Sequence, residues 1–379
     1  MTYSIRKRQY KNGYSYQIVF DRGKGPDGKR IREYVSCETL REAKSVAAER
    51  VHLYDEGTYI EPKKMTVKQL CDEWFNVHVK ENLAINTQKG YRVNLDNHVL
   101  PYIGSVPVQK LTPLQVQNMY KALKDKGLSP RSIHYVHTTL HSALHYAYKL
   151  QIISRNVTDF VTLPKQERFR PDIYSEEEMI RLLEACMGTF HEIPINLAAG
   201  LGLRRGEVFG LKWEDINFAD GTVHICHNLV CVDGKKSIFS PKTASSDRVL
   251  LMPDYLITML REHKTKQMRQ RLQSGGKYEN NDLVCCCTDG TPVHTGSYSE
   301  RFCNFLERNK LRHIRFHDLR HLNATVMLAR GVPMKIASER LGHSTINITM
   351  DTYSHVTVDM QKDAAQQLND AFSVVANEA

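Results

Sequence analysis

The sequence predicts a multidomain protein with a small α+β domain, an all-α domain of four helices, and a mainly α domain that contains a small antiparallel sheet. At 379 residues the chain is longer than one hydrophobic core usually serves. Its hydrophobic period changes from alternation near the N-terminus to helical spacing after residue 66. Polar segments at residues 62–64 and 163–171 are typical of linkers. We therefore expect domains at residues 1–62, 63–168 and 169–379.

The first domain should contain three strands and one helix. Residues 14–20 alternate between apolar and other side chains, the period of a half-buried strand, and residues 31–35 predict another strand. Residues 23–28 are rich in Gly, Pro and Asp and predict the turn between them. Thr39 followed by Glu42 has the spacing of a capping box and predicts a helix that ends near residue 57.

The second domain carries a series of helix start signals. Thr66, Thr112 and Ser129 each stand where a helix N-cap is expected, and a further helix is expected over residues 87–99. The helix after Ser129 carries apolar residues at helical spacing and four histidines on the neighbouring stripe, His134, His137, His141 and His145. No acidic residue accompanies them in the sequence, so we expect a solvated or phosphate-facing stripe and no metal site.

The third domain mixes helices with short strands. Ser175 and Glu178 predict a helix start, residues 222–230 and 248–251 predict strands, and the pattern is almost wholly helical from residue 298. The chain has nine cysteines, which is not an even number, and they are spread over a long sequence. They therefore do not indicate a disulfide framework. We expect Cys285, Cys286 and Cys287 on a strand over residues 283–287, where neighbouring side chains point to opposite faces and cannot share one metal.

Charge is unevenly distributed along the chain. The 52 Lys and Arg outnumber the 42 Asp and Glu, giving a formal charge of +10 and a pI near 9.0. The three predicted domains contribute +3, +8 and −1, so a polyanion such as nucleic acid would bind chiefly to the first two. No apolar run approaches the roughly 18 residues of a membrane span, and the N-terminus does not resemble a signal peptide. We expect a cytoplasmic protein that does not enter the membrane.

Two motifs of the third domain place polar residues in unusual positions. Arg204 and Glu207 interrupt a largely apolar stretch, where an unpaired charge is costly, so Arg204 should have a dedicated partner. An Arg–Glu pair on a helix surface is the simpler alternative. His317, Arg320 and His321 would share one helix face and could form a cradle for an anion.

Three further residues are weak signals when taken alone. Lys242 lies at a predicted hairpin tip, where most lysines are simply solvated. His343 follows a Leu-Gly pair, and Tyr353 lies ten residues later. Tyrosine is a poor nucleophile at its usual pKa of about 10 and would need cationic neighbours.

Together these residues resemble the active-site set of the tyrosine recombinases, or phage integrases. The match runs in chain order through Arg204, Glu207, Lys242, His317, Arg320, His343 and Tyr353. The strand-and-helix unit followed by a helical unit is also similar to the arm-binding and core-binding domains of integrases from temperate phages and conjugative transposons of Gram-positive bacteria. The resemblance implies that Tyr353 attacks a DNA phosphodiester to form a 3′-phosphotyrosine, with Arg204, Lys242, His317, Arg320 and His343 as the other catalytic residues. Glu207 and His321 would support them.

The resemblance also implies the partners. They are double-stranded attachment sites of core and arm type and three further copies of the chain, which act through a Holliday junction. No metal or other cofactor is expected, and the involvement of an excisionase or a host DNA-bending protein is left open. We expect DNA contacts from basic residues of the first two domains, namely Arg6, Lys7, Arg8, Lys29, Arg30, Arg32, Lys89, Arg92 and Arg131.

Two alternatives stay open at this point. Residues 332–347 resemble a helix-turn-helix, which would suit a non-catalytic sequence-specific regulator, but this alternative leaves Arg204, Lys242 and Tyr353 unexplained. A type IB topoisomerase shares the tyrosine chemistry but does not share the arrangement of the first two domains. A C-terminal amphipathic pattern over residues 361–375 predicts a short helix that packs either on its own domain or on a neighbouring protomer.

Overall fold

The computed structural model describes residues 2–10, 13–24, 28–55, 65–166, 173–232, 234–239, 246–342, 365–366 and 368–369. The chain divides into two compact units, Met1–Glu167 and Arg168–Ala379. No helix in the described ranges has the length and apolar character that crossing a bilayer requires.

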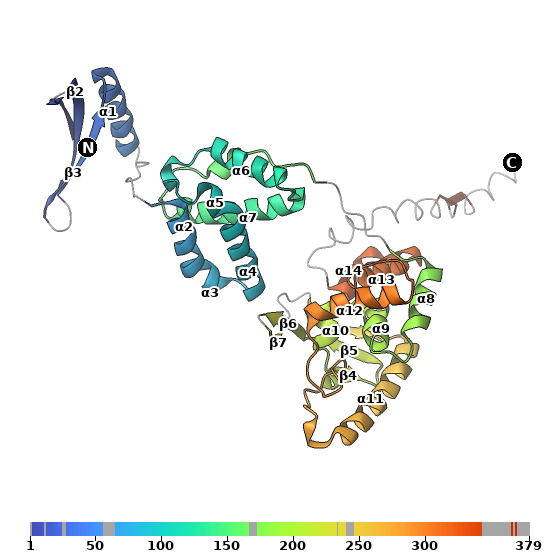
Figure 1. The fold of residues 1–379 in the computed structure, drawn as a ribbon. Coiled ribbons are helices and arrows are strands. Elements are labelled where there is room, and N and C mark those ends of the chain that lie inside the picture. The colour runs from blue at the N-terminus through green and yellow to red at the C-terminus, as the bar shows by residue number, and fades with distance from the viewer. Residues whose placement is uncertain are drawn as a thin grey trace, which may run out of the picture. The chain divides into compact units, whose positions relative to one another are not determined.

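An antiparallel sheet backed by one helix forms the N-terminal part (Figure 1). Its elements are β1 (Thr2–Tyr10), β2 (Gly13–Lys24), β3 (Arg30–Cys37) and α1 (Leu40–Asp55). Ile18 pairs with Ile5 on β1 and with Val35 on β3, so these three side chains share the face that packs on α1. The predicted helix start is confirmed, because the Glu42 backbone N–H donates to Thr39 Oγ1 at 3.2 Å.

Helices and short helical turns make up residues 67–160 (Figure 1). They are α2 (Val67–Trp74), π-helix η1 (Phe75–Val79), α3 (Lys80–Asn82), α4 (Ile85–Asn94), π-helix η2 (Leu95–Val99), α5 (Leu100–Ile103), 3₁₀-helix η3 (Val108–Lys110), α6 (Pro113–Asp125), α7 (Pro130–Lys149) and 3₁₀-helix η4 (Val157–Phe160). The predicted caps at Thr66, Thr112 and Ser129 are confirmed, the first two as reciprocal capping boxes. This part has a separate core that includes Leu70, Trp74, Leu123, Leu140 and Leu144.

The C-terminal unit is mainly helical with two small antiparallel sheets (Figure 1). Its helices are α8 (Glu176–Cys186), α9 (Glu192–Leu201), α10 (Arg205–Gly210), η5 (Trp213–Asp215), α11 (Asp254–Ser274), η7 (Gly275–Lys277), α12 (Thr295–Arg308), α13 (Asp318–Ala329) and α14 (Met334–Leu341). Strands β4 (Ile216–Asn217), β5 (Thr222–Ile225) and β8 (Arg248–Leu251) form one sheet, and β6 (Asn228–Val232) and β7 (Lys235–Phe239) form the other.

Two strand predictions in this unit are wrong in detail. The strand expected over residues 222–230 breaks at Cys226 and His227, because β5 joins one sheet and β6 the other. The strand expected over residues 283–287 contains only two isolated bridges, from Leu283 to Lys212 and from Cys286 to Pro292. Local hydrophobic pattern does not indicate which partner a strand will pair with, and pairing decides both cases.

Candidate active site

Arg204 lies at the start of α10, one residue outside the helix. It is the N-cap residue, with extended backbone angles, and Glu207 occupies the third helical position. The Arg204 backbone N–H donates to Glu207 Oε2 at 3.0 Å, and its Nη1 donates to Glu207 Oε1 at 2.6 Å. The expected dedicated partner of Arg204 is therefore Glu207, and the alternative of a pair on a helix surface is wrong because Glu207 is only 4% exposed.

A second arginine shares Glu207. Arg248 Nη2 on β8 lies 3.1 Å from Glu207 Oε2, and Arg248 Nε donates to the Arg340 carbonyl at 2.6 Å. Burial alone would raise the pKa of Glu207, but the charges of Arg248 and Arg204 and their hydrogen bonds outweigh it and hold this pKa below its usual value. Glu207 is therefore an anion that fixes both guanidinium groups.

Each of the two predicted catalytic arginines donates a hydrogen bond to a backbone carbonyl near another predicted site residue. Arg320 on α13 is 2% exposed, and its Nη1 donates to the carbonyl of Gly202 at 2.7 Å, two residues before Arg204. Arg204 Nη2 donates to the carbonyl of Gly342 at 2.6 Å. That carbonyl belongs to the peptide that Gly342 shares with His343, so Arg204 anchors the chain at the point where the predicted motif continues. Arg204 itself is 34% exposed and has solvent access.

Gly202 makes the first of these contacts geometrically feasible. It ends α9 in the left-handed conformation, with φ of +66°, which glycine adopts at little cost. A Cβ atom at this position would lie 2.5 Å from Leu341 Cδ2 and 2.8 Å from Asn323 Oδ1. Close approach of α9, α13 and α14 at Gly202 therefore requires a residue without a side chain.

The two histidines of the motif meet at the start of α13. The rings of His317 and His321 pack edge to face, with centroids 5.1 Å apart. Although His317 is exposed on one side, the protein packed around it, helped by His321 and Arg320, lowers its pKa to about 4. Burial also lowers the pKa of His321. Both rings are therefore neutral near pH 7 and offer single N–H donors, so among the three residues predicted to cradle an anion only Arg320 carries a charge.

An aromatic cluster fixes the arginine-bearing and histidine-bearing elements relative to each other. Phe209 on α10 lies 4.5 Å from Tyr298 on α12, and Tyr298 lies 5.1 Å from Phe316, the residue before His317 (ring centroids). Both pairs are T-shaped, a favourable arrangement for aromatic rings. This packing connects α10, which follows Arg204, to the segment that carries His317.

Three predicted residues, Lys242, His343 and Tyr353, lie outside the described residues. So does most of the predicted C-terminal helix, of which residues 365–366 and 368–369 are described and helical. Two further arginines of the described part of this unit, Arg205 and Arg248, were not predicted from the sequence as site residues. Arg205 Nη1 donates to Ser299 Oγ. Arg248 lies 41 residues from Glu207 and has no local signal, so only the tertiary structure reveals this pair.

The predicted DNA-binding residues of the sheet divide between its two faces. Strand register places Arg6, Arg8 and Arg32 on the face opposite α1, since they pair with Gln17, Ser15 and Asp21. Arg30 and Lys29 are also exposed, and Arg30 and Arg32 both lie within 3.5 Å of Asp21. Lys7 belongs to the other face, where its Nζ lies 3.9 Å above the Tyr14 ring. The predicted group is therefore not one continuous patch.

The predicted DNA-binding residues of the helical part differ in how freely their charges could contact DNA. Arg92 donates to both Asp72 and Asp96, at 2.7 Å and at 2.5–2.7 Å, so its charge is largely neutralised within the domain. Lys89 is half-buried, and Arg131 is exposed.

The expectation that no acid accompanies the histidine stripe is wrong, because His141 Nε2 lies 3.1 Å from Asp159 Oδ1.

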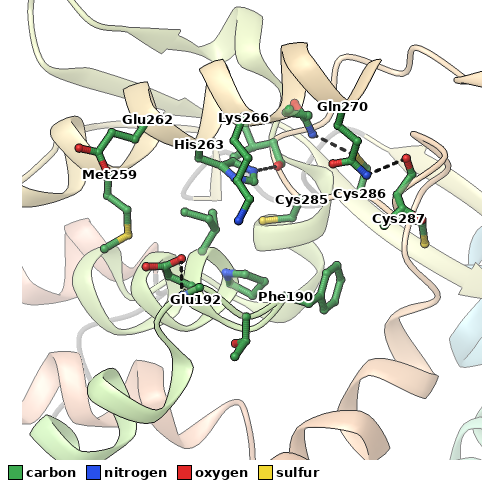
Figure 2. A pocket seen from close by; sticks show the side chains of 17 residues that line it. Phe190, Glu192, Met259, Glu262, His263, Lys266, Gln270, Cys285, Cys286 and Cys287 are labelled. Carbon is green, nitrogen blue, oxygen red and sulfur yellow. Dashed lines mark hydrogen bonds between the residues drawn. The ribbon is translucent and has the colours of Figure 1, made fainter. Parts of the chain in front are cut away.

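A cavity elsewhere in the C-terminal unit contains none of the predicted site residues. It has a volume of about 400 Å³ and is lined by Phe190, His263, Lys266 and the three consecutive cysteines (Figure 2). Cys285 is buried, whereas Cys286 accepts from Gln267 Nε2 at 2.9 Å. His263 is engaged with the Val284 carbonyl at 2.8 Å. The lining cysteines and His263 form no cluster of metal ligands.

Comparisons with known proteins agree with this geometry. Residues 173–360 match the model of the phage integrase family, and residues 66–124 match the phage integrase N-terminal SAM-like domain. A "Tyrosine recombinase XerC-like" protein of Caldanaerobacter subterraneus subsp. tengcongensis is 29% identical over an alignment 392 positions long, which covers 97% of this chain and 99% of the relative.

Solved structures show the same fold. The Tn1549 transposon integrase in complex with transposon right end DNA is 21% identical, with a TM-score of 0.68 over 80% of this chain and 99% of that chain. A lambda integrase tetramer bound to a Holliday junction is 19% identical, with a TM-score of 0.57 over 90% of this chain and 92% of that chain. The two family models, the full-length relative and the shared fold lead to one conclusion: the chain belongs to the phage integrase family and is a site-specific tyrosine recombinase.

Proposed function

We propose that this recombinase integrates and excises a mobile element, with Tyr353 as the nucleophile that attacks a DNA phosphodiester. The Tyr353 oxygen forms a bond to phosphorus while the bond to the 5′-oxygen breaks, leaving a 3′-phosphotyrosine and a free 5′-hydroxyl. The reverse attack by a 5′-hydroxyl of the partner strand rejoins the DNA through a Holliday junction. The proposal depends on two hydrogen bonds, one from Arg204 to the Gly342 carbonyl and one from Arg320 to the Gly202 carbonyl.

The arginines would stabilise the transition state. Negative charge builds on the non-bridging phosphate oxygens, and planar guanidinium groups match their geometry. Two side-chain N–H groups of Arg204 donate to Glu207 and Gly342, and its remaining N–H groups have no acceptor among the described residues. They can therefore donate to a phosphate. Arg320 is buried and would reach the same phosphate from α13.

The other residues would manage protons and hydrogen bonds. His317, neutral because its pKa is lowered to about 4, would donate a single N–H to the phosphate. Lys242, in the segment between β7 and β8, would protonate the leaving 5′-oxygen. His343, which follows the anchored Gly342, would add a further donor. His321 and Glu207 would position these groups.

This chemistry requires no metal and no nucleotide cofactor. Two arginines supply the positive charge that a divalent cation supplies in other phosphoryl-transfer enzymes. The phosphotyrosine keeps the energy of the broken bond, so ligation does not depend on ATP.

The remaining domains would bind the attachment sites. We assign the core-type site to a four-helix unit over residues 63–168, whose net charge of +8 suits a clamp on DNA. The exposed basic face of the N-terminal sheet, with Arg6, Arg8 and Arg32, would contact the arm-type site. By analogy with the lambda integrase tetramer on a Holliday junction, four copies would act together. Its DNA substrate implies a cytoplasmic enzyme, with excisionase or a host DNA-bending protein as candidate accessory factors.

A covalent-trapping assay tests the proposal. Footprinting on the ends of the adjacent mobile element would first identify the attachment site. A nicked suicide substrate carrying this site should give a protein–DNA adduct that resists SDS. Tyr353→Phe should abolish the adduct, and Tyr255→Phe, a change at a half-exposed tyrosine of the same unit, should retain it. An adduct formed by Tyr353→Phe, or none formed by the wild type on its own site, would overturn the assignment.

A further inference from the structure

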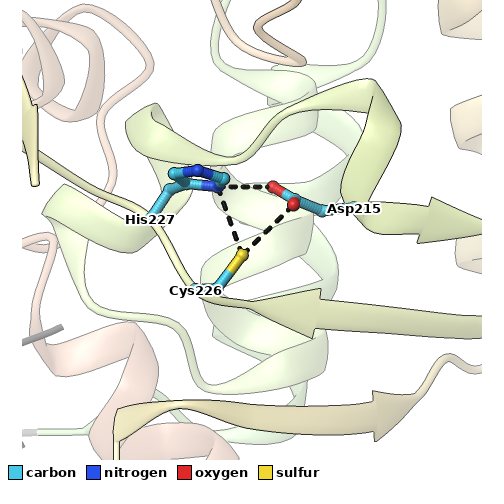
Figure 3. A group of neighbouring side chains, drawn as sticks. All are labelled: Asp215, Cys226 and His227. Atoms are coloured by element: carbon cyan, nitrogen blue, oxygen red, sulfur yellow. Dashed lines mark hydrogen bonds and ion pairs between the residues drawn. The ribbon is translucent and has the colours of Figure 1, made fainter. Parts of the chain in front are cut away.

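Three potential metal ligands converge at the point where the expected strand 222–230 breaks. Figure 3 shows Asp215 from the end of η5 and Cys226 and His227 from the β5–β6 connection, with their side chains pointing toward one another. Cys226 Sγ lies 3.2 Å from Asp215 Oδ1 and 3.3 Å from His227 Nδ1. His227 Nδ1 lies 2.9 Å from Asp215 Oδ2. Each side chain therefore touches the other two, with the two Asp215 oxygens facing different partners.

These separations are close to the edges of a zinc tetrahedron. Zinc bonds of about 2.3 Å to sulfur and about 2.0–2.2 Å to nitrogen and oxygen place neighbouring ligand atoms about 3.4–3.6 Å apart. The two atoms of each contact need to move apart by only a few tenths of an ångström, and Asp215 has an oxygen beside each of the other two donors. One Nδ1 lies near both the thiol and the carboxylate, so the group is not a relay of the Cys–His–Asp type, in which the two ring nitrogens serve different partners.

The surroundings hold the ligands in place. The Asp215 side chain is 6% exposed, and its Oδ2 also accepts from the Lys212 backbone N–H at 3.0 Å. Such a bond to a ligating carboxylate is typical of the outer shell of a metal site. The nearby Lys212 ammonium is directed to Glu214 Oε1, 2.8 Å away. His227 is 23% exposed, so the cluster stays open to solvent on one side.

We propose that Asp215, Cys226 and His227 bind a zinc ion, with water as the fourth ligand. A mixed sulfur, nitrogen and oxygen donor set suits Zn²⁺ and excludes Mg²⁺ and Ca²⁺, which prefer oxygen alone. On binding, the thiol proton passes to solvent. The imidazole proton, which sits on Nδ1 while this atom donates to the Asp215 carboxylate, exchanges through solvent to Nε2 and so frees Nδ1 for the metal. No oxidation or reduction takes place.

The ion would brace the helix that presents Arg204. Asn228 and Leu229 directly follow the cluster, and both pack against α10 where its glycines allow close approach. A Cβ on Gly206 would lie 2.1 Å from Asn228 Oδ1, and one on Gly210 would lie 2.8 Å from the Leu229 backbone nitrogen. A metal that joins Asp215, which follows α10, to the Cys226–His227 segment would therefore hold the start of β6 against α10. Its role is structural and separate from the DNA chemistry.

Cobalt substitution tests the proposal on the full-length, untagged, chelator-treated protein. We expect one Co²⁺ per chain, a thiolate-to-cobalt charge-transfer band, loss of this band when Zn²⁺ is added, and a higher melting temperature with Zn²⁺. Cys226→Ser should remove the band. His227→Gln and Asp215→Asn should weaken Zn²⁺ binding by at least about 10-fold.

Cys303→Ser is the matched control, because Cys303 Sγ lies 3.4 Å from His313 Nε2 but forms no third contact of this kind among the described residues. This variant should keep the band and the zinc-induced rise in melting temperature. The absence of a band in the wild type would overturn the proposal. So would a band that persists in Cys226→Ser, or one that is lost equally in Cys303→Ser. Circular dichroism of each variant checks folding, and His227→Gln serves in place of Cys226→Ser if the latter does not fold.

Discussion

Glu207 Oε2 and Arg248 Nη2 form a buried ion pair 3.1 Å apart, with the two side chains 5% and 8% exposed. Removing one partner of such a pair leaves the other charge without compensation in a poorly solvated place. Glu207→Gln should therefore lower the free energy of unfolding by about 3–5 kcal/mol, measured by urea denaturation. It should also reduce covalent trapping, because Arg204 loses its anionic partner.

Glu176→Gln is the matched control for this change. Glu176 pairs with Arg330 at 3.2 Å, but both side chains are more than 70% exposed. Exposed pairs contribute little, so the effect should stay within about 1 kcal/mol. Equal effects of the two substitutions would contradict the structural role assigned to Glu207.

Gly202 and Gly188 have almost the same backbone angle but different surroundings. Their φ values are +66° and +69°, and no atom lies within 4 Å of a Cβ added at Gly188. Gly188→Ala should therefore cost only the conformational term, about 1–2 kcal/mol. Gly202→Ala should cost at least about 1 kcal/mol more, because its methyl group overlaps Leu341 and Asn323. Thermal denaturation of both variants measures the difference, and equal losses would show that the space at Gly202 is unimportant.

His191 should make the C-terminal unit sensitive to acid. Burial, with a smaller effect of Arg301, lowers the pKa of His191 to about 4, whereas the unfolded chain has a value near 6.5. Between these values the unfolded state binds a proton that the folded state does not, so stability falls as the pH drops below about 6.5. His191 alone should account for a loss of about 2 kcal/mol between pH 7.5 and pH 5.

Urea denaturation of the wild type and His191→Gln at these two pH values measures this contribution. The difference between the two pH values should shrink by about that amount in the variant, whatever its overall stability. Other histidines with lowered pKa values, such as His263 and His317, keep part of the dependence. An identical pH dependence in both proteins would show that His191 is not responsible.

The basic face of the N-terminal sheet should determine binding to the arm-type site. Arg6→Ala combined with Arg8→Ala removes two charges from the face opposite α1. The plot of log affinity against log salt concentration should become shallower by about 2, whereas cleavage of a short core-site substrate stays normal. Arg41→Ala combined with Lys44→Ala removes the same charge from exposed positions on α1 and should change the slope little. A similar effect of both double variants would contradict a role for the sheet face.

Local signals predicted the helices well and the long-range pairs poorly. Thr66, Thr112 and Ser175 each accept a hydrogen bond from the third residue of a helix, an interaction contained within four consecutive residues. The order Arg204, His317 and Arg320 also follows from sequence, because the family motif supplies it. By contrast, the pairing of Glu207 with Arg248 and the break at Cys226 depend on which strands meet, and no short window of sequence contains that information.

The π-helical turn η1 is the point at which the continuous helix formed by α2, η1 and α3 can lose a residue without turning its buried side chains away from the core. Trp74 and Val79 are both buried although they are five residues apart, and Val77, which normal α-helical spacing would turn inward, is 58% exposed. The Lys80 backbone N–H accordingly donates to the Phe75 carbonyl, five residues back. Deleting Asn76 would leave the two anchors four residues apart, which an ordinary α-helix accommodates. A deletion elsewhere in α2 would rotate the following side chains by about 100° away from the core. Natural insertions and deletions within this continuous helix should therefore concentrate at residues 75–78.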